Sequence, residues 1–275
     1  MKINIKKRKY LFFIIPCILQ FVFSSLFVYN SVSVYNEFKD SFVNEEAVSN
    51  PLLPLQSAFT YWIGANVVDF FGNIFFYIVF LGAMLPCMPV VYRCFKDKKY
   101  AQNNASNYLK IFLASGLLAF IPLLFNFVST LMFIPAMKPD SVYDIYFDVL
   151  TGDGLSNVFY TNPVIYEIIY MLIIFAMCGA IGCLCFATAQ LCNYNVLAVM
   201  IPETLIYILH LFNRGFGIEK VISPIIYCRS LSGIMQNKKI ALIEFGIIIA
   251  LLLMFILINS IRSHITKNKV VGEKA

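Results

Sequence analysis

Charged side chains are scarce in this chain. Only 13% of its 275 residues are Asp, Glu, Lys or Arg, whereas 60% are hydrophobic. A soluble domain usually carries about 25% charged residues, so these few charges could not cover a water-facing surface of this size. The shortage of charge argues against a soluble globular domain and indicates a protein embedded in a lipid bilayer.

Motifs that carry chemistry are also missing. The sequence has no G-x-x-x-x-G-K-[ST] phosphate loop, no H-E-x-x-H zinc motif and no G-x-S-x-G nucleophile elbow. Its two histidines, His210 and His264, are far apart, and its eight cysteines form no C-x-x-C pair, which gives little support to a metal site or a disulfide framework. Most of the cysteines lie in apolar runs, where they are expected to act as small apolar fillers. We predict no catalytic residue, metal ion or cofactor in this chain.

What the sequence has in abundance is apolar runs of about 20 residues, the length of helix that crosses a bilayer. A spanning segment must satisfy its own backbone hydrogen bonds, and strand-like alternation is absent, so we expect helices. The predicted fold is an all-α integral membrane protein, with one transmembrane domain over residues 1–275. Its six predicted helices cover roughly 10–30, 66–92, 109–135, 163–189, 195–212 and 240–261.

The first apolar run has a second interpretation, because a basic stretch followed by an apolar core also describes a signal peptide. The run is long enough to span a membrane, and no small-x-small cleavage site follows it cleanly. A retained helix, preceded by a short basic segment on the inner membrane face, is therefore the favoured interpretation.

The charged residues orient the chain, since Lys and Arg gather on the cytoplasmic side of a membrane. Residues 1–10 carry five basic side chains and no acid, and residues 93–110 carry five against one Asp. The tail 262–275 is also basic, whereas the loops 32–65 and 138–162 are acidic. We predict a multi-pass protein of the cell membrane with both termini in the cytoplasm. The net charge of +6 reports on loop placement and does not suggest nucleic acid as a partner.

One loop conflicts with this map. Residues 213–239 carry five basic side chains against one Glu, yet a count of six helices places them outside. The middle of this loop, 217–236, is moderately apolar and is broken by Pro224. Two interpretations stay open: a re-entrant or interfacial pair of helices over 217–236, or a helix count that is wrong by one.

Ionisable side chains inside apolar runs are costly to bury and mark candidate functional positions. Asp69, Glu167 and Glu244 lie near the outer ends of their predicted helices, where each side chain could reach the lipid headgroups. Glu203 and His210 lie deeper and are seven residues apart, so they share one helix face. Two interpretations remain for that pair: a substrate contact or proton relay, or a buried polar pair that holds helices together.

Small residues recur at spacings of four in the stretch AMCGAIGCLCFATA, which includes Gly179 and Cys183. Small side chains at this spacing let two helices approach closely, so we predict tight helix packing here, within one chain or between two. Prolines are expected to bend or end their helices at Pro86, Pro89, Pro122 and Pro135.

Two long stretches follow each other in the middle of the chain: NYLKIFLASGLLAFIPLLFNFVSTLMFIPAMKPD and LSNVFYTNPVIYEIIYMLIIFAMCGAIGCLCFA. They resemble membrane subunits of ABC-2 type exporters from Gram-positive bacteria. The resemblance covers roughly 60–187, with a weaker likeness in SPIIY near residue 225. The resemblance implies six helices with cytoplasmic ends, a second permease chain as partner, and a separate cytoplasmic ATPase subunit that holds ATP and Mg. It implies no enzyme activity in this chain.

In such permeases the loop between the second and third helices docks on the ATPase. By resemblance that role falls on residues 93–108, with Arg93, Lys96, Asp97, Lys98, Lys99 and Tyr100 as the expected contacts. The loop departs from the family pattern, because an acidic residue, a Gly and an Arg before the Tyr are not evident. An alternative role for its lysines is attachment to anionic lipid.

The sequence therefore predicts a permease subunit that moves a peptide, an antimicrobial compound or a lipid-like substrate. The alternative is a non-transporting immunity or sensor-associated membrane protein, which would bind a peptide at the acidic outer loops. An intramembrane enzyme is the weakest hypothesis, since no nucleophile, metal set or carboxylate pair lies in register on facing helices.

Overall fold

The computed structural model describes residues 5–43, 57–64, 70–89, 105–143, 155–191, 199–208, 246–258 and 261. The regular structure in these ranges is helical throughout, which confirms the all-α class. Four helices are long and apolar enough to cross a membrane, so the chain has the character of a membrane protein. These candidate spans are Phe13–Glu37, Phe70–Cys87, Ser106–Phe133 and Pro163–Gln190.

The last two predicted helices correspond to shorter helices in the structure. Val199–Ile208 lies within the predicted 195–212, and Gly246–Ile258 lies within the predicted 240–261. The described part of each is apolar and shorter than a full span. The count of six spans and the side on which each terminus lies stay predictions. The proposed re-entrant segment 217–236 lies outside the described residues.

The long helices are α1 (Ile5–Val43), α3 (Phe70–Met84), α5 (Ala105–Phe133) and α8 (Pro163–Leu191). Short elements connect or cover them: α2 (Ala58–Tyr61), the 3₁₀ turns η1 (Leu85–Cys87) and η2 (Ser141–Tyr143), and α7 (Ser156–Thr161). Helix α1 continues well beyond the predicted end near residue 30, because the stretch up to Val43 contains no Gly or Pro that would stop it.

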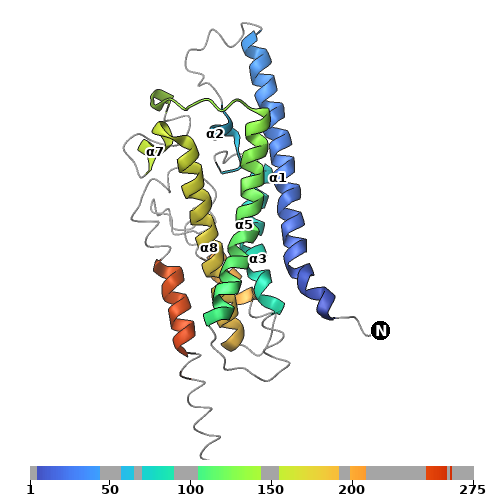
Figure 1. The fold of residues 1–275 in the computed structure, drawn as a ribbon, viewed down its shortest axis with the longest axis vertical. Coiled ribbons are helices and arrows are strands. Elements are labelled where there is room, and N and C mark those ends of the chain that lie inside the picture. The colour runs from blue at the N-terminus through green and yellow to red at the C-terminus, as the bar shows by residue number, and fades with distance from the viewer. Residues whose placement is uncertain are drawn as a thin grey trace, which may run out of the picture.

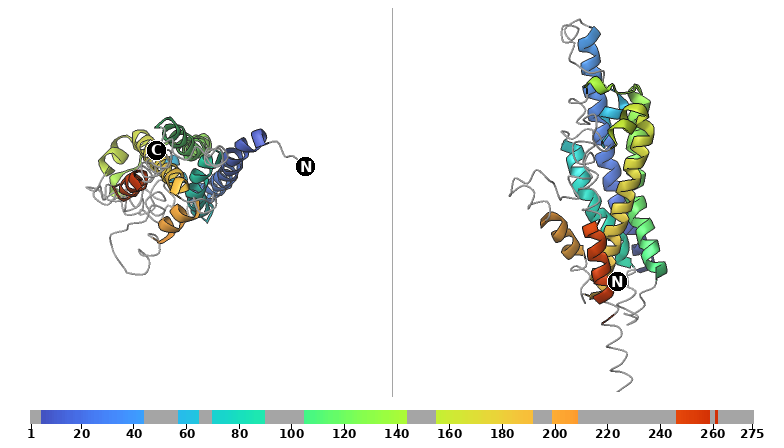
Figure 2. Two further views of the ribbon diagram at one scale, coloured as in Figure 1. Left: turned by 90° about the horizontal axis from the view of Figure 1, so that it is seen from below. Right: turned by 90° about the vertical axis from the view of Figure 1, so that its left-hand side faces the viewer.

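Helices α5 and α8 run side by side in opposite directions and form the centre of the bundle (Figure 1). Tyr108 near the start of α5 packs on Phe186 near the end of α8, with ring centroids 4.9 Å apart. Helix α1 lies at the edge of the bundle when it is seen end-on (Figure 2, left). Its outward face exposes large apolar side chains, as expected of a surface that meets lipid, among them Leu11, Ile14, Ile15, Ile18 and Val22.

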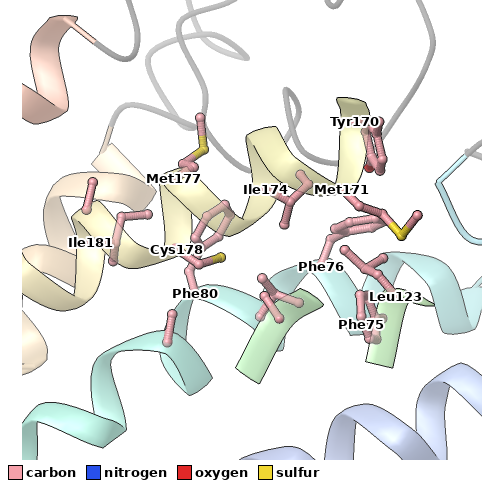
Figure 3. Close-up of a cluster of buried hydrophobic side chains, with 14 of the residues drawn as sticks. Phe75, Phe76, Phe80, Leu123, Tyr170, Met171, Ile174, Met177, Cys178 and Ile181 are labelled. Carbon is pink, nitrogen blue, oxygen red and sulfur yellow. The ribbon is translucent and has the colours of Figure 1, made fainter. Parts of the chain in front are cut away.

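The core lies where α3, α5 and α8 meet (Figure 3). Phe75 and Phe76 of α3, Leu123 of α5, and Tyr170 and Ile174 of α8 are all buried there. The opposite face of α5 exposes apolar side chains at helical spacing: Leu109, Leu113, Leu117, Ile121, Leu124 and Val128. A helix that is apolar both toward the core and away from it matches a helix surrounded by protein and lipid.

The predicted close packing around the small residues of α8 is confirmed within one chain. A Cβ atom added at Gly179 would lie 2.6 Å from the Phe112 ring of α5. The cysteines predicted to be small fillers are buried at positions Cys87, Cys178, Cys183 and Cys185, and Cys17 is half-buried. The Sγ atoms of Cys87 and Cys185 lie 3.0 Å apart, which joins η1 to α8 in the core.

The prolines act differently from one another. Pro86 lies in the 3₁₀ turn that interrupts the helix after α3, before helical residues resume at Met88, and Pro135 lies two residues after the end of α5, which is in line with the predicted bends and ends. Pro122 does not end α5, which continues to Phe133. Ser24 of α1 donates its hydroxyl to the Pro122 carbonyl at 3.4 Å, which ties α1 to α5 beside this proline.

Candidate functional site

The predicted ATPase-contact residues, Arg93, Lys96, Asp97, Lys98, Lys99 and Tyr100, lie outside the described residues. Their flanking helices are described. The end of α3, continued by η1, and the start of α5 lie at the same end of the bundle as the start of α1 (Figure 1). This is the end that the basic residues of the sequence assign to the cytoplasm.

Two of the predicted intramembrane polar residues, Asp69 and His210, also lie outside the described residues. Glu203 is half-buried on the helix Val199–Ile208, and its Oε2 atom has no hydrogen-bond partner among the described residues. One turn further on, the Tyr207 ring stacks on Tyr77 of α3, with centroids 6.3 Å apart and planes within 6°. Glu203 therefore sits on a helix that packs against α3, and the predicted pairing of Glu203 with His210 stays a prediction.

A part of the first predicted outer loop is folded into the bundle. We call residues 57–64 the docked segment; all of them are buried except Thr60, which is half-buried. The backbone N–H of Ala58 donates to the Pro135 carbonyl at 3.0 Å, and that of Ile63 donates to Oδ1 of Asn126 at 3.0 Å. This segment carries no charge and is rich in aromatic residues, and the outer location of the loop 32–65 stays a prediction.

Asn126 holds the docked segment to two of the long helices. It is fully buried on α5, where its Oδ1 accepts the Ile63 N–H and its Nδ2 donates to the Ser24 carbonyl of α1 at 3.0 Å. One amide side chain thus joins α1, α5 and the docked segment. Because buried polar groups need partners, this amide fixes the position of the segment more sharply than apolar packing alone.

Trp62, the single tryptophan of the chain, is the centre of the docked segment and is 0% exposed. Its ring meets Phe127 of α5 at 5.3 Å and Tyr170 of α8 at 5.4 Å, both in edge-to-face geometry. Such aromatic pairs add about 0.5–1.5 kcal/mol beyond the area they bury. The ring contacts and the Asn126 hydrogen bonds together hold the docked segment in the bundle.

Glu167 of α8 lies beneath this segment and is also 0% exposed. Neither of its carboxyl oxygens has a hydrogen-bond partner among the described residues. The Trp62 indole N–H lies next to the carboxyl group and interacts with it, but its geometry falls short of a hydrogen bond. The expectation that Glu167 reaches the headgroups is wrong, because its side chain turns into the protein.

The sequence contained a signal for the burial of Glu167. Tyr170, Ile174, Cys178 and Ile181 follow it at spacings of three or four, and all four are buried. This spacing places Glu167 on the inward face of α8. The opposite face, with Val164, Ile165, Ile168 and Leu172, is exposed.

The chemistry available at this site is narrow. Among the described residues, no three His, Cys, Asp or Glu side chains gather closely enough to hold a metal ion. The site combines one carboxyl group, one indole N–H and several aromatic rings beneath a short covering segment. Such a site can bind a proton or stabilise one arrangement of the bundle over another.

Comparisons with known proteins leave the chain without an assigned family. No family model, no curated protein and no solved structure matches it.

Proposed function

We propose that this protein is the permease subunit of an ATP-driven ABC-2 type exporter in the cell membrane. It would move a peptide, an antimicrobial compound or a lipid-like substrate, together with a second permease chain. A separate cytoplasmic subunit would bind ATP and Mg and hydrolyse the nucleotide. One observation carries the proposal: the basic segment 93–108 is tied at both ends to candidate membrane spans, Phe70–Cys87 and Ser106–Phe133, at the basic end of the bundle.

This arrangement suits the transmission of movement from a soluble partner into the membrane. A water-soluble segment that is held by two helices passes a rigid-body movement of its partner to both of them. The two helices concerned, α3 and α5, meet α8 in the shared core of Phe75, Leu123 and Ile174. Because packed cores do not deform continuously, a displacement at the segment would shift the bundle as a unit.

The first test of this proposal is co-purification. The tagged chain is extracted from its native membrane in a mild detergent, and bound proteins are identified by mass spectrometry. We expect a subunit that contains a G-x-x-x-x-G-K-[ST] phosphate loop. Changing Lys96, Lys98 and Lys99 to Glu is expected to abolish its recovery, because the charge of the contact surface is reversed.

The matched control changes Lys39 and Lys138 to Glu. Both side chains are exposed, and both lie in stretches that the charge map assigns to the outside. This variant is expected to retain the ATPase. Failure of the native chain to recover an ATPase would contradict the permease proposal and favour the immunity or sensor function. Recovery of the ATPase with the triple variant would show that residues 93–108 are not its binding site.

A further inference from the structure

The carboxyl group of Glu167 lacks the partners that buried charges normally have. It is fully buried, both its oxygens are without hydrogen bonds among the described residues, and the Trp62 N–H lies beside it. An isolated carboxylate in such surroundings costs several kcal/mol even after relaxation. In practice a group in this position is neutralised, most simply by a proton on one of its oxygens.

The side chains around Glu167 do not supply a compensating charge. The titratable groups on the elements packed around it are phenols: Tyr61 on α2, Tyr160 on α7, and Tyr166 and Tyr170 on α8 itself. Helix α3 carries Tyr77, and Cys87 follows in η1. The Tyr108 and Lys110 side chains of α5 lie at the far end of the bundle, where Tyr108 meets Phe186. Within the described residues, no Lys, Arg or His faces the carboxyl group.

The packing at this site favours a proton over a larger cation. Trp62 contacts Phe127 and Tyr170 at ring distances of 5.3 and 5.4 Å, and Phe159 of α7 contacts Tyr166 at 5.2 Å. These contacts show close packing of the rings next to Trp62, which lies beside Glu167, and next to Tyr166, which precedes Glu167 in the chain. A proton needs no cavity, whereas an amine or a metal ion would need the rings to separate.

We propose that Glu167 is a proton-binding site whose proton controls the docking of residues 57–64. With the proton bound, the neutral carboxyl group tolerates the cover of Trp62, and the docked segment stays in place. When the O–H bond breaks, the proton passes to water, the electron pair stays on the carboxylate, and the charge must be hydrated. Hydration requires the docked segment to move away.

The docked segment is the element around Glu167 that can be released at the lowest cost. Helix α2 has four residues, whereas α5 and α8 have 29 each. Among the described residues, hydrogen bonds from the backbone of Ala58 to Pro135 and of Ile63 to Asn126 attach it to the bundle. These bonds and the two ring contacts of Trp62 are each modest, and together they are comparable to the cost of an isolated buried carboxylate.

Trp62 gives a direct test, because it is the single tryptophan and lies beside Glu167. The full chain is placed in lipid nanodiscs, and tryptophan emission and its quenching by aqueous iodide are followed from about pH 4 to about pH 10. We expect one transition, with Trp62 shielded on the acid side and the quenching constant several-fold higher on the alkaline side. In infrared spectra, the carbonyl band of a protonated carboxyl group should disappear over the same range.

Two variants separate Glu167 from other titrating groups. Glu167→Gln keeps the shape of the neutral acid, so it should stay folded, stay shielded at every pH and lose both the transition and the part of the infrared band that belongs to Glu167. Glu203→Gln, on the separate helix 199–208, should keep them.

Several outcomes would overturn the proposal. One is a Trp62 signal that is flat across the pH range in the native chain. A second is a transition that persists in Glu167→Gln, which would report the ionisation of a tyrosine. A third is an emission change on adding an alkylammonium ion at constant pH, which would indicate a cation site. If Glu167→Gln does not fold, the infrared measurement on the Glu203→Gln chain keeps the test decisive, because that chain retains Glu167 and lacks the half-buried carboxyl group of Glu203.

Discussion

Replacing Asn126 with leucine is expected to lower the free energy of unfolding by about 2–4 kcal/mol. The substitution removes the hydrogen bonds from the Ile63 N–H to Asn126 and from Asn126 to the Ser24 carbonyl. It leaves the Ile63 N–H without a partner among the described residues, in a residue that is 0% exposed. A buried donor without a partner costs about 1–3 kcal/mol. The free energy of unfolding therefore falls by more than the two hydrogen bonds alone contribute.

Denaturant unfolding in detergent micelles measures this effect. A thiol-reactive dye reports unfolding, because Cys87, Cys178 and Cys185 are fully buried in the folded protein. Asn157→Leu is the matched control, since the Asn157 side chain is exposed on α7. Equal denaturant concentrations at the unfolding midpoint for the two variants would show that Asn126 does not hold the docked segment.

Replacing Gly116 with leucine is expected to lower stability by about 3 kcal/mol through overpacking. A Cβ atom added at Gly116 would lie 2.7 Å from two ring atoms of Phe175 and 2.8 Å from the Phe175 carbonyl oxygen. The ring could turn away, but the carbonyl belongs to the backbone of α8. Relief of this clash therefore requires α5 and α8 to separate, at the contact that forms the centre of the bundle.

Gly246→Leu is the matched control for this change. Gly246 is also helical, it is exposed, and nothing lies within 4 Å of a Cβ atom placed there. Leucine has a better helix propensity than glycine, so the control variant should be neutral or slightly stabilised. The same dye assay measures both variants. A Gly116→Leu protein as stable as Gly246→Leu would mean that α5 and α8 do not approach as closely as described.

The helices of this protein could be predicted from sequence because their signal is local. A run of about 20 apolar residues must satisfy its own backbone hydrogen bonds in a membrane, and helix is the one structure that does so within a single segment. This reasoning located the four long helices, and the small residues around Gly179 correctly indicated a close helix contact. The ends were less predictable, as α1 shows by continuing to Val43 through polar residues.

The docked segment could not be predicted, because its position depends on distant residues. Ile63 and its acceptor Asn126 are 63 residues apart, and Asn126 is 102 residues from Ser24. Nothing in the local sequence distinguishes a loop that returns into the bundle from one that stays outside. The burial of Glu167 was predictable in part, since it shares a helix face with Tyr170 and Ile174. The position of Trp62 over Glu167 could not be predicted from the sequence.

We propose that the basic end of the bundle receives an ATPase. Site-specific photocrosslinking in intact cells tests it most directly, with a photoreactive amino acid placed at Lys98. The control position is Val142, which is exposed and lies beyond the opposite end of α5. We predict that position 98 captures a subunit with a phosphate loop and that position 142 captures none. Absence of such a subunit from the position 98 adducts, at normal expression and membrane insertion, would contradict the claim.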